Sequence, residues 1–141
     1  MLYTVFVKQT ILRVLWVLAG ASVALVLALH VVRPADSTLL LASLGGSTLF
    51  LFGLTALPPT QPRALFGGHL ISALIGVICY QLFGDATWVM VLSVLITIAA
   101  LILSRTVHPP AGANPLIMIH SHAGFIDIWT HVFAGVLVLA I

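Results

Sequence analysis

Long apolar runs separated by short polar connectors dominate the pattern of the chain. Five runs stand out, at residues 14–32, 39–57, 65–83, 86–104 and, more weakly, 125–141. A helix rises about 1.5 Å per residue, so crossing a hydrocarbon core of about 30 Å takes roughly 20 residues. The alternating pattern of a membrane β-barrel is absent. The pattern therefore predicts an all-α membrane protein with about five transmembrane segments.

The composition excludes an ordinary soluble domain. Hydrophobic residues make up 62% of the 141 residues and charged residues only 6%, whereas about a quarter of the residues in soluble domains are charged. A globule of this size could not hide so much apolar surface from water, so its solvent is a lipid bilayer. The five Lys and Arg residues form no basic patch interleaved with aromatics. We expect an integral membrane protein with no nucleic-acid partner.

The distribution of Lys and Arg predicts the orientation in the membrane. With five crossings, four basic residues fall on the N-terminal side and only Arg33 on the other: Lys8, Arg13, Arg63 and Arg105. This count predicts a cytoplasmic N-terminus and a C-terminus outside. We expect the membrane to be the bacterial inner membrane. The first run is longer than the apolar region of a signal peptide, so we expect it to be retained. We divide the chain into a transmembrane helix, 1–33, and a transmembrane domain, 34–141.

Two segments have the composition of interrupted or re-entrant helices. The stretch SLGGST, residues 43–48, places two glycines inside the second run. It is either a close helix–helix contact face or a helix break that lines a cavity. After residue 108, the apolar piece 116–119 is too short to span, and Asn114-Pro115 is typical of a helix start with Asn as the N-cap. We expect a half-helix there, then a turn at Gly124 into the last segment.

A weak internal repeat relates two parts of the chain. Each part has an apolar run, paired prolines, a further proline and a histidine in the next apolar run. The histidines are His69 in the first part and His131 in the second. Two crossings separate the parts, so the repeat is parallel, as in some transporters. A duplicated hairpin without a transport role would have the same pattern.

The second proline connector, SRTVHPPAGANP, combines rigidity with positive charge. Its paired prolines prevent helix continuation and favour an extended His108. The start of the following half-helix favours an anion, and Arg105 and Arg63 add charge unless they are simple interface anchors. We expect this elbow to contact SLGGST or its sister elbow PPTQPR. The elbow residues are Pro58, Pro59, Pro62, Pro109, Pro110 and Gly112.

Three stretches in this order, SLGGSTLFLFG, QPRALFGGHLISALIGV and SRTVHPPAGANPL, resemble the signatures of the HPP family of integral membrane proteins. The resemblance runs from about residue 34 to the C-terminus. It implies a compact multi-helix membrane domain, and some members of the family are associated with nitrite transport. The positions that carry the resemblance are Ser43, Gly45, Gly46, Ser47, Gln61, Pro62, Arg63, Gly68, His69, His108, Pro109, Pro110 and Gly112.

Hydrogen-bond donors and positive charge concentrate at the interrupted segments, whereas Asp36 and Asp85 fall on the opposite side. A small anion needs a few donors and a compensating positive field. We therefore expect transport of a small inorganic anion, nitrite by the resemblance, with no cofactor and no enzymatic activity. The expected path is lined by Ser43, Gly45, Gly46, Ser47, Thr48, Arg63, His69, Arg105 and His108.

Two alternatives stay open, a structural or assembly protein and a histidine-based metal-binding protein. Four histidines are close in sequence and, with Asp127, could bind a transition metal: His108, His120, His122 and His131. But His120 and His122 point to different sides of a helix, so we predict no metal site. Proton coupling is the stronger role for histidine, with His69 the best placed.

We also expect a homo-oligomer, because five short helices make a thin wall around a path. Small residues allow helices to approach closely, and the candidates for the contact faces are Gly20, Ser22 and Gly76.

Overall fold

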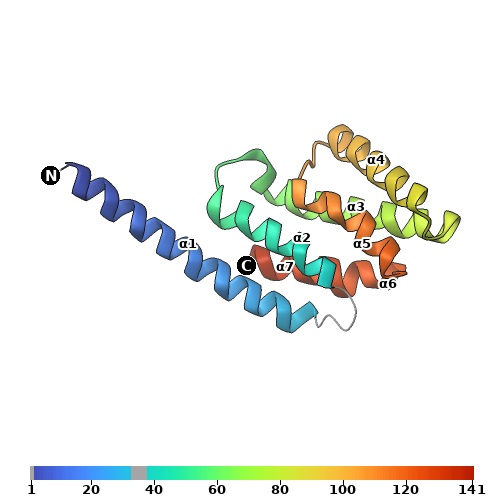
Figure 1. Ribbon diagram of the computed structural model, residues 1–141, viewed down its shortest axis with the longest axis horizontal. Coiled ribbons are helices and arrows are strands. Elements are labelled where there is room, and N and C mark those ends of the chain that lie inside the picture. Colours follow the sequence, from blue (N-terminus) through green and yellow to red (C-terminus); the bar gives the residue numbers. More distant parts are fainter. Residues whose placement is uncertain (1, 33–37) are drawn as a thin grey trace.

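The computed structural model describes the backbone of residues 2–32 and 38–141, and the side chains of 7–32 and 42–141 (Figure 1). Every element in these ranges is a helix, which confirms the all-α prediction. Arg33 and Asp36, used above for orientation, lie outside the described residues. The elements are α1 (Leu2–Val32), α2 (Thr38–Thr48), η1 (Leu49–Gly53), η2 (Pro58–Thr60), α3 (Pro62–Phe83), α4 (Thr87–Ser104), η3 (Pro109–Ala113), α5 (Asn114–His120), α6 (Phe125–Asp127), η4 (Ile128–Phe133) and α7 (Ala134–Ala140).

Three described helices are long and apolar enough to cross a membrane: Val7–Val32, Pro62–Phe83 and Thr87–Ser104. Two shorter apolar helices, Ala42–Gly53 and Phe125–Ala140, complete the set. These five helices coincide with the five apolar runs, which confirms the predicted class and approximate count. The protein is therefore an integral membrane protein.

The stretch SLGGST is not a helix break. Thr38–Thr48 is one α-helix, and a turn of π-helix, η1, continues it directly. A Cβ added to Gly46 would lie 3.2 Å from Cβ of Pro110, whereas one added to Gly45 would have nothing within 4 Å. The cavity-break hypothesis is therefore wrong, and the contact-face hypothesis holds for Gly46. The glycine serves the close approach of two elements and leaves the helix intact.

The short segment after the elbow runs alongside α3 in the same direction. Asn114 contacts His69, a Cβ on Gly76 would meet Cα of Pro115 at 2.6 Å, and the His122 side chain reaches Asp85 beyond the end of α3. This segment therefore carries the chain from the elbows to the Asp85 end of the bundle (Figure 1).

The last segment then runs back towards the elbows, because Ile128 lines a groove with Leu74 while Phe133 packs against Phe66. The turn expected at Gly124 is present, with φ −100° and ψ 178°. However, the structure places residue 141 at the elbow end, whereas the sequence placed the C-terminus on the opposite side. The sequence did not predict this difference, because the apolar piece 116–119 is too short to span. Nothing in it indicated that the segment packs along α3 and carries the chain to the Asp85 end.

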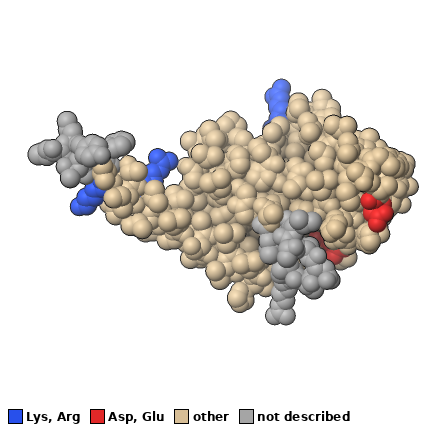
Figure 2. All heavy atoms as spheres, viewed as in Figure 1, with Lys and Arg blue, Asp and Glu red and all other residues tan. Residues whose placement is uncertain are grey.

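Charged side chains divide between the two ends of the molecule. Lys and Arg gather at the left end and the upper edge of Figure 2, and acidic side chains at the right end. Asp85 follows Gly84, whose positive φ of 80° ends α3. For Arg63, Arg105 and Asp85 this division is the one that the connectors predicted, and it separates Asp85 from the elbows.

Two of the predicted oligomer contacts are occupied within the chain. A Cβ on Gly20 would lie 2.7 Å from the Phe52 ring, and Gly76 faces Pro115. Ser22 is exposed. The glycines are therefore used to pack α1 on η1 and α3 on α5, and the expectation that Gly20 or Gly76 faces a second copy is wrong.

Candidate functional site: a buried polar cluster between the two elbows

The two proline elbows have the same local structure. Each is a short 3-10 helix that begins with paired prolines, η2 at Pro58 and η3 at Pro109. The residue before each pair is extended, Leu57 with ψ 148° and His108 with φ −131° and ψ 102°. This follows from the clash between a proline ring and the preceding residue. The extended His108 was predicted, whereas the 3-10 helix that follows it was not.

The second elbow contacts both of its predicted partners. Nδ1 of His108 lies 2.7 Å from the carbonyl oxygen of Pro59 in the sister elbow. The Ser43 hydroxyl of α2 donates to the carbonyl oxygen of Pro110, at 2.9 Å. The second elbow is therefore held in the bundle by two hydrogen bonds. Its own His108 side chain bonds to the first elbow, and the Ser43 side chain of α2 bonds to Pro110.

Five buried polar side chains meet where the elbows touch α2 and α3. We call them the polar cluster: Ser43, Ser47, His69, His108 and Asn114, each exposed by 2% or less. Oγ of Ser47 lies at the centre, 2.8 Å from Nε2 of His69 and 2.9 Å from Nε2 of His108. The rings of His69 and His108 are 5.1 Å apart. Residues that lie far apart in the sequence thus share one hydrogen-bonded site.

Asn114 is the member of the cluster that sequence analysis missed as a site residue. It was interpreted as a helix N-cap, but it makes no side-chain cap bond and begins α5 in a helical conformation. Its Nδ2 lies 2.9 Å from Nδ1 of His69 and 3.2 Å from the His69 carbonyl oxygen. Its Oδ1 accepts from the Ser43 hydroxyl, at 2.8 Å. The Asn-Pro pair signalled a helix start, and only the packing of α5 on α3 reveals the second role.

Two backbone carbonyl groups beside the cluster can only accept hydrogen bonds. They determine which ring nitrogen of each histidine carries the hydrogen. The Pro59 carbonyl only accepts, so Nδ1 of His108 carries a hydrogen and donates to it. The His69 carbonyl oxygen also only accepts, so the Asn114 side chain turns its NH₂ group towards it. The same NH₂ group donates its other hydrogen to Nδ1 of His69. Neutral His69 therefore carries its hydrogen on Nε2 and donates to Ser47. The two histidines adopt opposite tautomers.

Burial lowers the pKa of His108, and the hydrogen bond from its Nδ1 to the Pro59 carbonyl acts in the other direction. The edge of the Phe50 ring lies against it, with ring centroids 5.7 Å apart. His108 is therefore neutral at pH 7 in an enclosed, largely apolar setting.

Two arginines lie next to each other at the elbow end of the bundle. Nη2 of Arg63 donates to the carbonyl oxygen of Ser104, at 2.8 Å, and Arg105 is the next residue. Arg105 ends α4 in the left-handed conformation, with φ 56°. Both arginines are exposed. His69 lies six positions beyond Arg63 on α3, which is about 9 Å deeper along the helix.

Comparison with known protein families identifies the family of the chain. The model of the HPP transmembrane region matches residues 7–141. The chain belongs to the HPP transmembrane family. Two transmembrane proteins of Dictyostelium discoideum are similar to it, one 24% identical over 134 residues and one 30% identical over 128 residues. These alignments cover 88% and 85% of the chain but only 47% and 41% of the relatives, so the HPP chain spans less than half of their length. No solved structure matches it.

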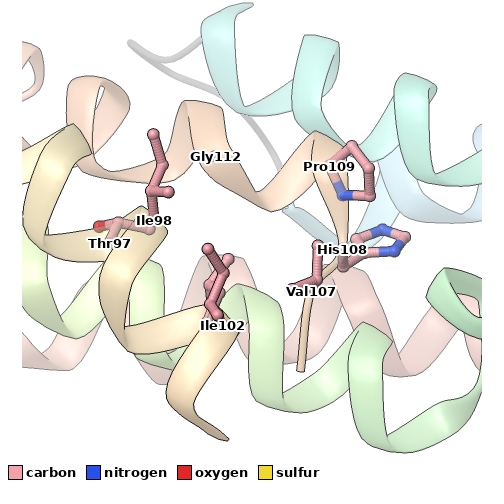
Figure 3. A pocket seen from close by; sticks show the side chains of 8 residues that line it. Thr97, Ile98, Ile102, Val107, His108, Pro109 and Gly112 are labelled. Atoms are coloured by element: carbon pink, nitrogen blue, oxygen red, sulfur yellow. The ribbon is translucent and has the colours of Figure 1, made fainter. Parts of the chain in front are cut away.

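A cavity of about 210 Å³ lies beside the polar cluster of this HPP protein, between α4 and the second elbow (Figure 3). Its lining is mostly apolar, with His108 at one edge and Thr97 at the other. Gly112, predicted as an elbow residue, lines this cavity. Thr97 is fully buried, and among the described residues its hydroxyl has no hydrogen-bond partner.

The other predicted path and elbow residues lie around the cluster rather than in it. Thr48 is buried, but its hydroxyl donates to the carbonyl oxygen of Leu44 within α2. Gly45 lies in the middle of α2 next to Gly46. Pro58 and Pro62 are exposed at the first elbow. The structure therefore brings together Ser43, Ser47, His69 and His108 and leaves the remaining residues at the periphery.

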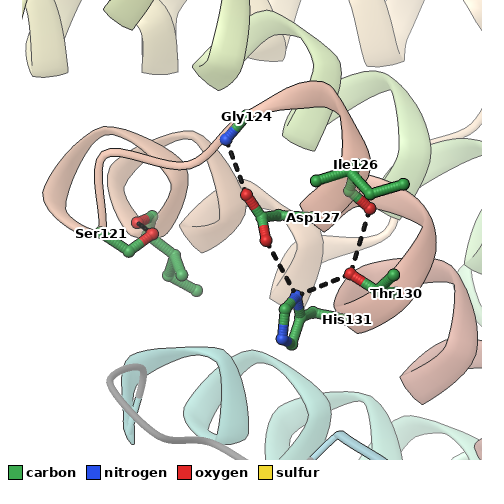
Figure 4. A network of polar contacts seen from close by, with 7 residues as sticks. Ser121, Gly124, Ile126, Asp127, Thr130 and His131 are labelled. Atoms are coloured by element: carbon green, nitrogen blue, oxygen red, sulfur yellow. Dashed lines mark hydrogen bonds and ion pairs between the residues drawn. The ribbon is translucent and has the colours of Figure 1, made fainter.

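The histidines beyond the cluster lie elsewhere in the HPP fold. His122 stacks on Tyr80 and contacts Asp85 at 3.0 Å. His131 contacts Asp127 at 3.3 Å, and Asp127 in turn accepts from the Gly124 amide at 2.7 Å (Figure 4). His131 therefore does not repeat the place of His69, and His122 and Asp127 have separate partners. Within the described part of the chain, no group of three or more His, Cys, Asp or Glu is arranged to hold a metal.

Proposed function

We propose that this HPP protein transports a small inorganic anion, nitrite by resemblance to members of the family. The supporting observation is the coincidence of the polar cluster with the Arg63–Arg105 pair at one end of an apolar bundle. Polar and ionisable groups inside a membrane are costly and therefore mark functional sites. A pure scaffold has no need of five interlinked polar side chains at this depth.

The charge arrangement suits an anion that must both enter and leave. The exposed arginines raise the local concentration of anions at the mouth. The polar cluster further inside contains no arginine, whose full ion pair would hold the anion too tightly for release. The proposed path runs from Arg63 and Arg105 towards Ser47, His69 and His108, and the acids Asp85 and Asp127 lie at the opposite end.

Uptake by proteoliposomes tests the proposal. Nitrite, nitrate and formate should enter vesicles that contain the protein, and a monovalent cation should not. Arg63→Ala and Arg105→Ala should each lower anion uptake severalfold, because they remove charge from the mouth. Arg13→Ala is the matched control, since Arg13 is an exposed arginine on α1. Cation flux, or anion flux that is indifferent to Arg63 and Arg105, would count against anion transport.

The partner expected in the membrane is a second copy of the chain. Large apolar side chains on the first half of α1, including Leu15 and Trp16, are exposed at 56% and 78%. A homo-oligomer would use this half of α1, since the glycine faces are filled within the chain. The mass of the protein in nanodiscs measures the number of copies that associate, and a uniform population of monomers would exclude the homo-oligomer.

A further inference from the structure

The centre of the polar cluster is one hydrogen short. Oγ of Ser47 lies within hydrogen-bond distance of three atoms: the Ser43 carbonyl oxygen at 3.0 Å, Nε2 of His69 and Nε2 of His108. The Ser43 carbonyl only accepts, and His69 donates from Nε2. In the neutral cluster Ser47 has one hydrogen for two acceptors, the Ser43 carbonyl and Nε2 of His108. One of these two contacts therefore has no hydrogen.

A single added hydrogen satisfies all three contacts. A serine hydroxyl donates once and accepts twice. If Nε2 of His108 carries a hydrogen, Ser47 accepts from both histidines and donates to the Ser43 carbonyl. The positions of the heavy atoms already fit this arrangement, so only the hydroxyl hydrogen has to turn.

We propose that the polar cluster is a proton-binding site. One proton binds to Nε2 of His108, and the hydroxyl hydrogen of Ser47 rotates from His108 to the Ser43 carbonyl oxygen. His69 keeps its hydrogen on Nε2 and remains neutral, because the Asn114 amide donates to its Nδ1. No covalent bond other than the new N–H bond forms, and the cluster gains one positive charge.

The groups around His108 favour a single proton there. His69 on α3 is the titratable group that packs directly against it, and Ser47 and Phe50 approach it from α2 and η1. The second elbow and α4 contribute the cavity lining, which holds no titratable side chain other than His108 itself. The charged groups at this end are Arg63 and Arg105, and the described acids lie at the other end. A positive charge on His108 opposes a second one on His69, whose ring centroid lies 5.1 Å away.

Proton binding explains how a cluster rich in acceptors attracts an anion. This link between proton and anion rests on the proposed function. Ser43 also has one hydrogen between two acceptors, the Pro110 carbonyl and Oδ1 of Asn114. The neutral cluster therefore offers an anion no free donor. Protonation supplies a positive charge beside the path, so the anion and the proton are linked.

Histidine nitrogen NMR on the full chain in nanodiscs tests the site without any transport measurement. At about pH 7.5 the spectra should show opposite tautomers, with hydrogen on Nδ1 of His108 and on Nε2 of His69. Between about pH 7.5 and about pH 4, the range in which histidines titrate, His108 should become doubly protonated while His69 should not. Identical tautomers, titration of His69 in place of His108, or no titration of either ring would overturn the proposal.

Ser47→Ala and Thr48→Ala form a matched pair of variants, each of which removes one buried hydroxyl of α2. Ser47→Ala removes the acceptor for the new N–H bond, and hydrogen bonds to charged groups are the stronger ones. The His108 midpoint should fall by about one pH unit, a tenfold loss of proton affinity. Thr48→Ala removes a buried hydroxyl of the same helix that donates to the Leu44 carbonyl and lies outside the cluster, so its midpoint should stay near that of the wild type. Equal midpoints in both variants would contradict the role of Ser47.

Anion uptake separates the two proposals. If both hold, uptake should rise as the pH falls through the His108 midpoint, and Ser47→Ala should move this rise to lower pH. If His108 titrates as expected but no anion enters, the proton site stands and anion transport fails. If anions enter at a rate independent of pH and His108 does not titrate, transport stands and the proton site fails.

Discussion

At the scale of single residues, the site depends on groups whose hydrogen-bond capacity is fully constrained. The Pro59 carbonyl sets the tautomer of His108, and the Asn114 amide sets that of His69. Neither constraint is visible in the chemistry of the histidines alone. The sequence identified His69 inside an apolar run and His108 before the paired prolines, but it could not assign a donor or an acceptor to either ring.

Asn114→Ala should lower the thermal stability of the protein, because Nδ1 of His69 loses its buried partner. Leaving buried polar groups unpaired costs about 1–3 kcal/mol. Gln61→Ala is the control, since Gln61 holds the matching place before a proline in the first elbow but is exposed. Thermal unfolding in detergent measures both, and equal stability of the two variants would refute the buried role of Asn114.

At the scale of elements, glycine decides how closely helices approach. A Cβ on Gly76 would lie 2.6 Å from Cα of Pro115, which is too close for any real side chain. Because glycine has no Cβ, α5 packs directly on α3. Gly46 does the same for α2 and the second elbow. The sequence predicted contact or breakage at such glycines without deciding between them. The choice depends on the partner surface, which lies far away in the sequence.

Gly76→Ala should destabilise the fold by about 1–3 kcal/mol, because the new methyl group would overlap the backbone of Pro115 at 2.6 Å. Gly45→Ala should leave the stability unchanged or raise it by up to about 1 kcal/mol, because alanine favours the helix and nothing lies within 4 Å. Thermal unfolding of the two variants in the same detergent makes the comparison. A large loss in Gly45→Ala would contradict an unbroken α2.

At the scale of the whole molecule, the two elbows and the last residues lie at one end and the Asp85 turn lies at the other. This arrangement places Arg63, Arg105 and the polar cluster towards one end of the bundle. The distribution of basic side chains agrees with it, because lysine and arginine collect on the elbow side (Figure 2).

Cysteine labelling measures this topology. In a Cys79→Ser background, Gln61→Cys and Ile141→Cys should react with an impermeant thiol reagent from the same side of the membrane, and Asp85→Cys from the other. All three positions are exposed, so access depends on the side alone. Reaction of Ile141→Cys together with Asp85→Cys would show that the segment from the second elbow does not carry the chain across.

The sequence by itself determined the solvent, the helical class, the five apolar helices and the elbows, because these follow from local hydropathy and from the backbone limits of proline. It also singled out Ser43, Ser47, His69 and His108. Only the tertiary structure decided that these four side chains meet, that Asn114 joins them, and that α2 is unbroken. The physical reason is distance along the chain. Ser43 and Asn114 bond across 71 positions, and the order of apolar and polar residues holds no record of which distant surfaces pack together.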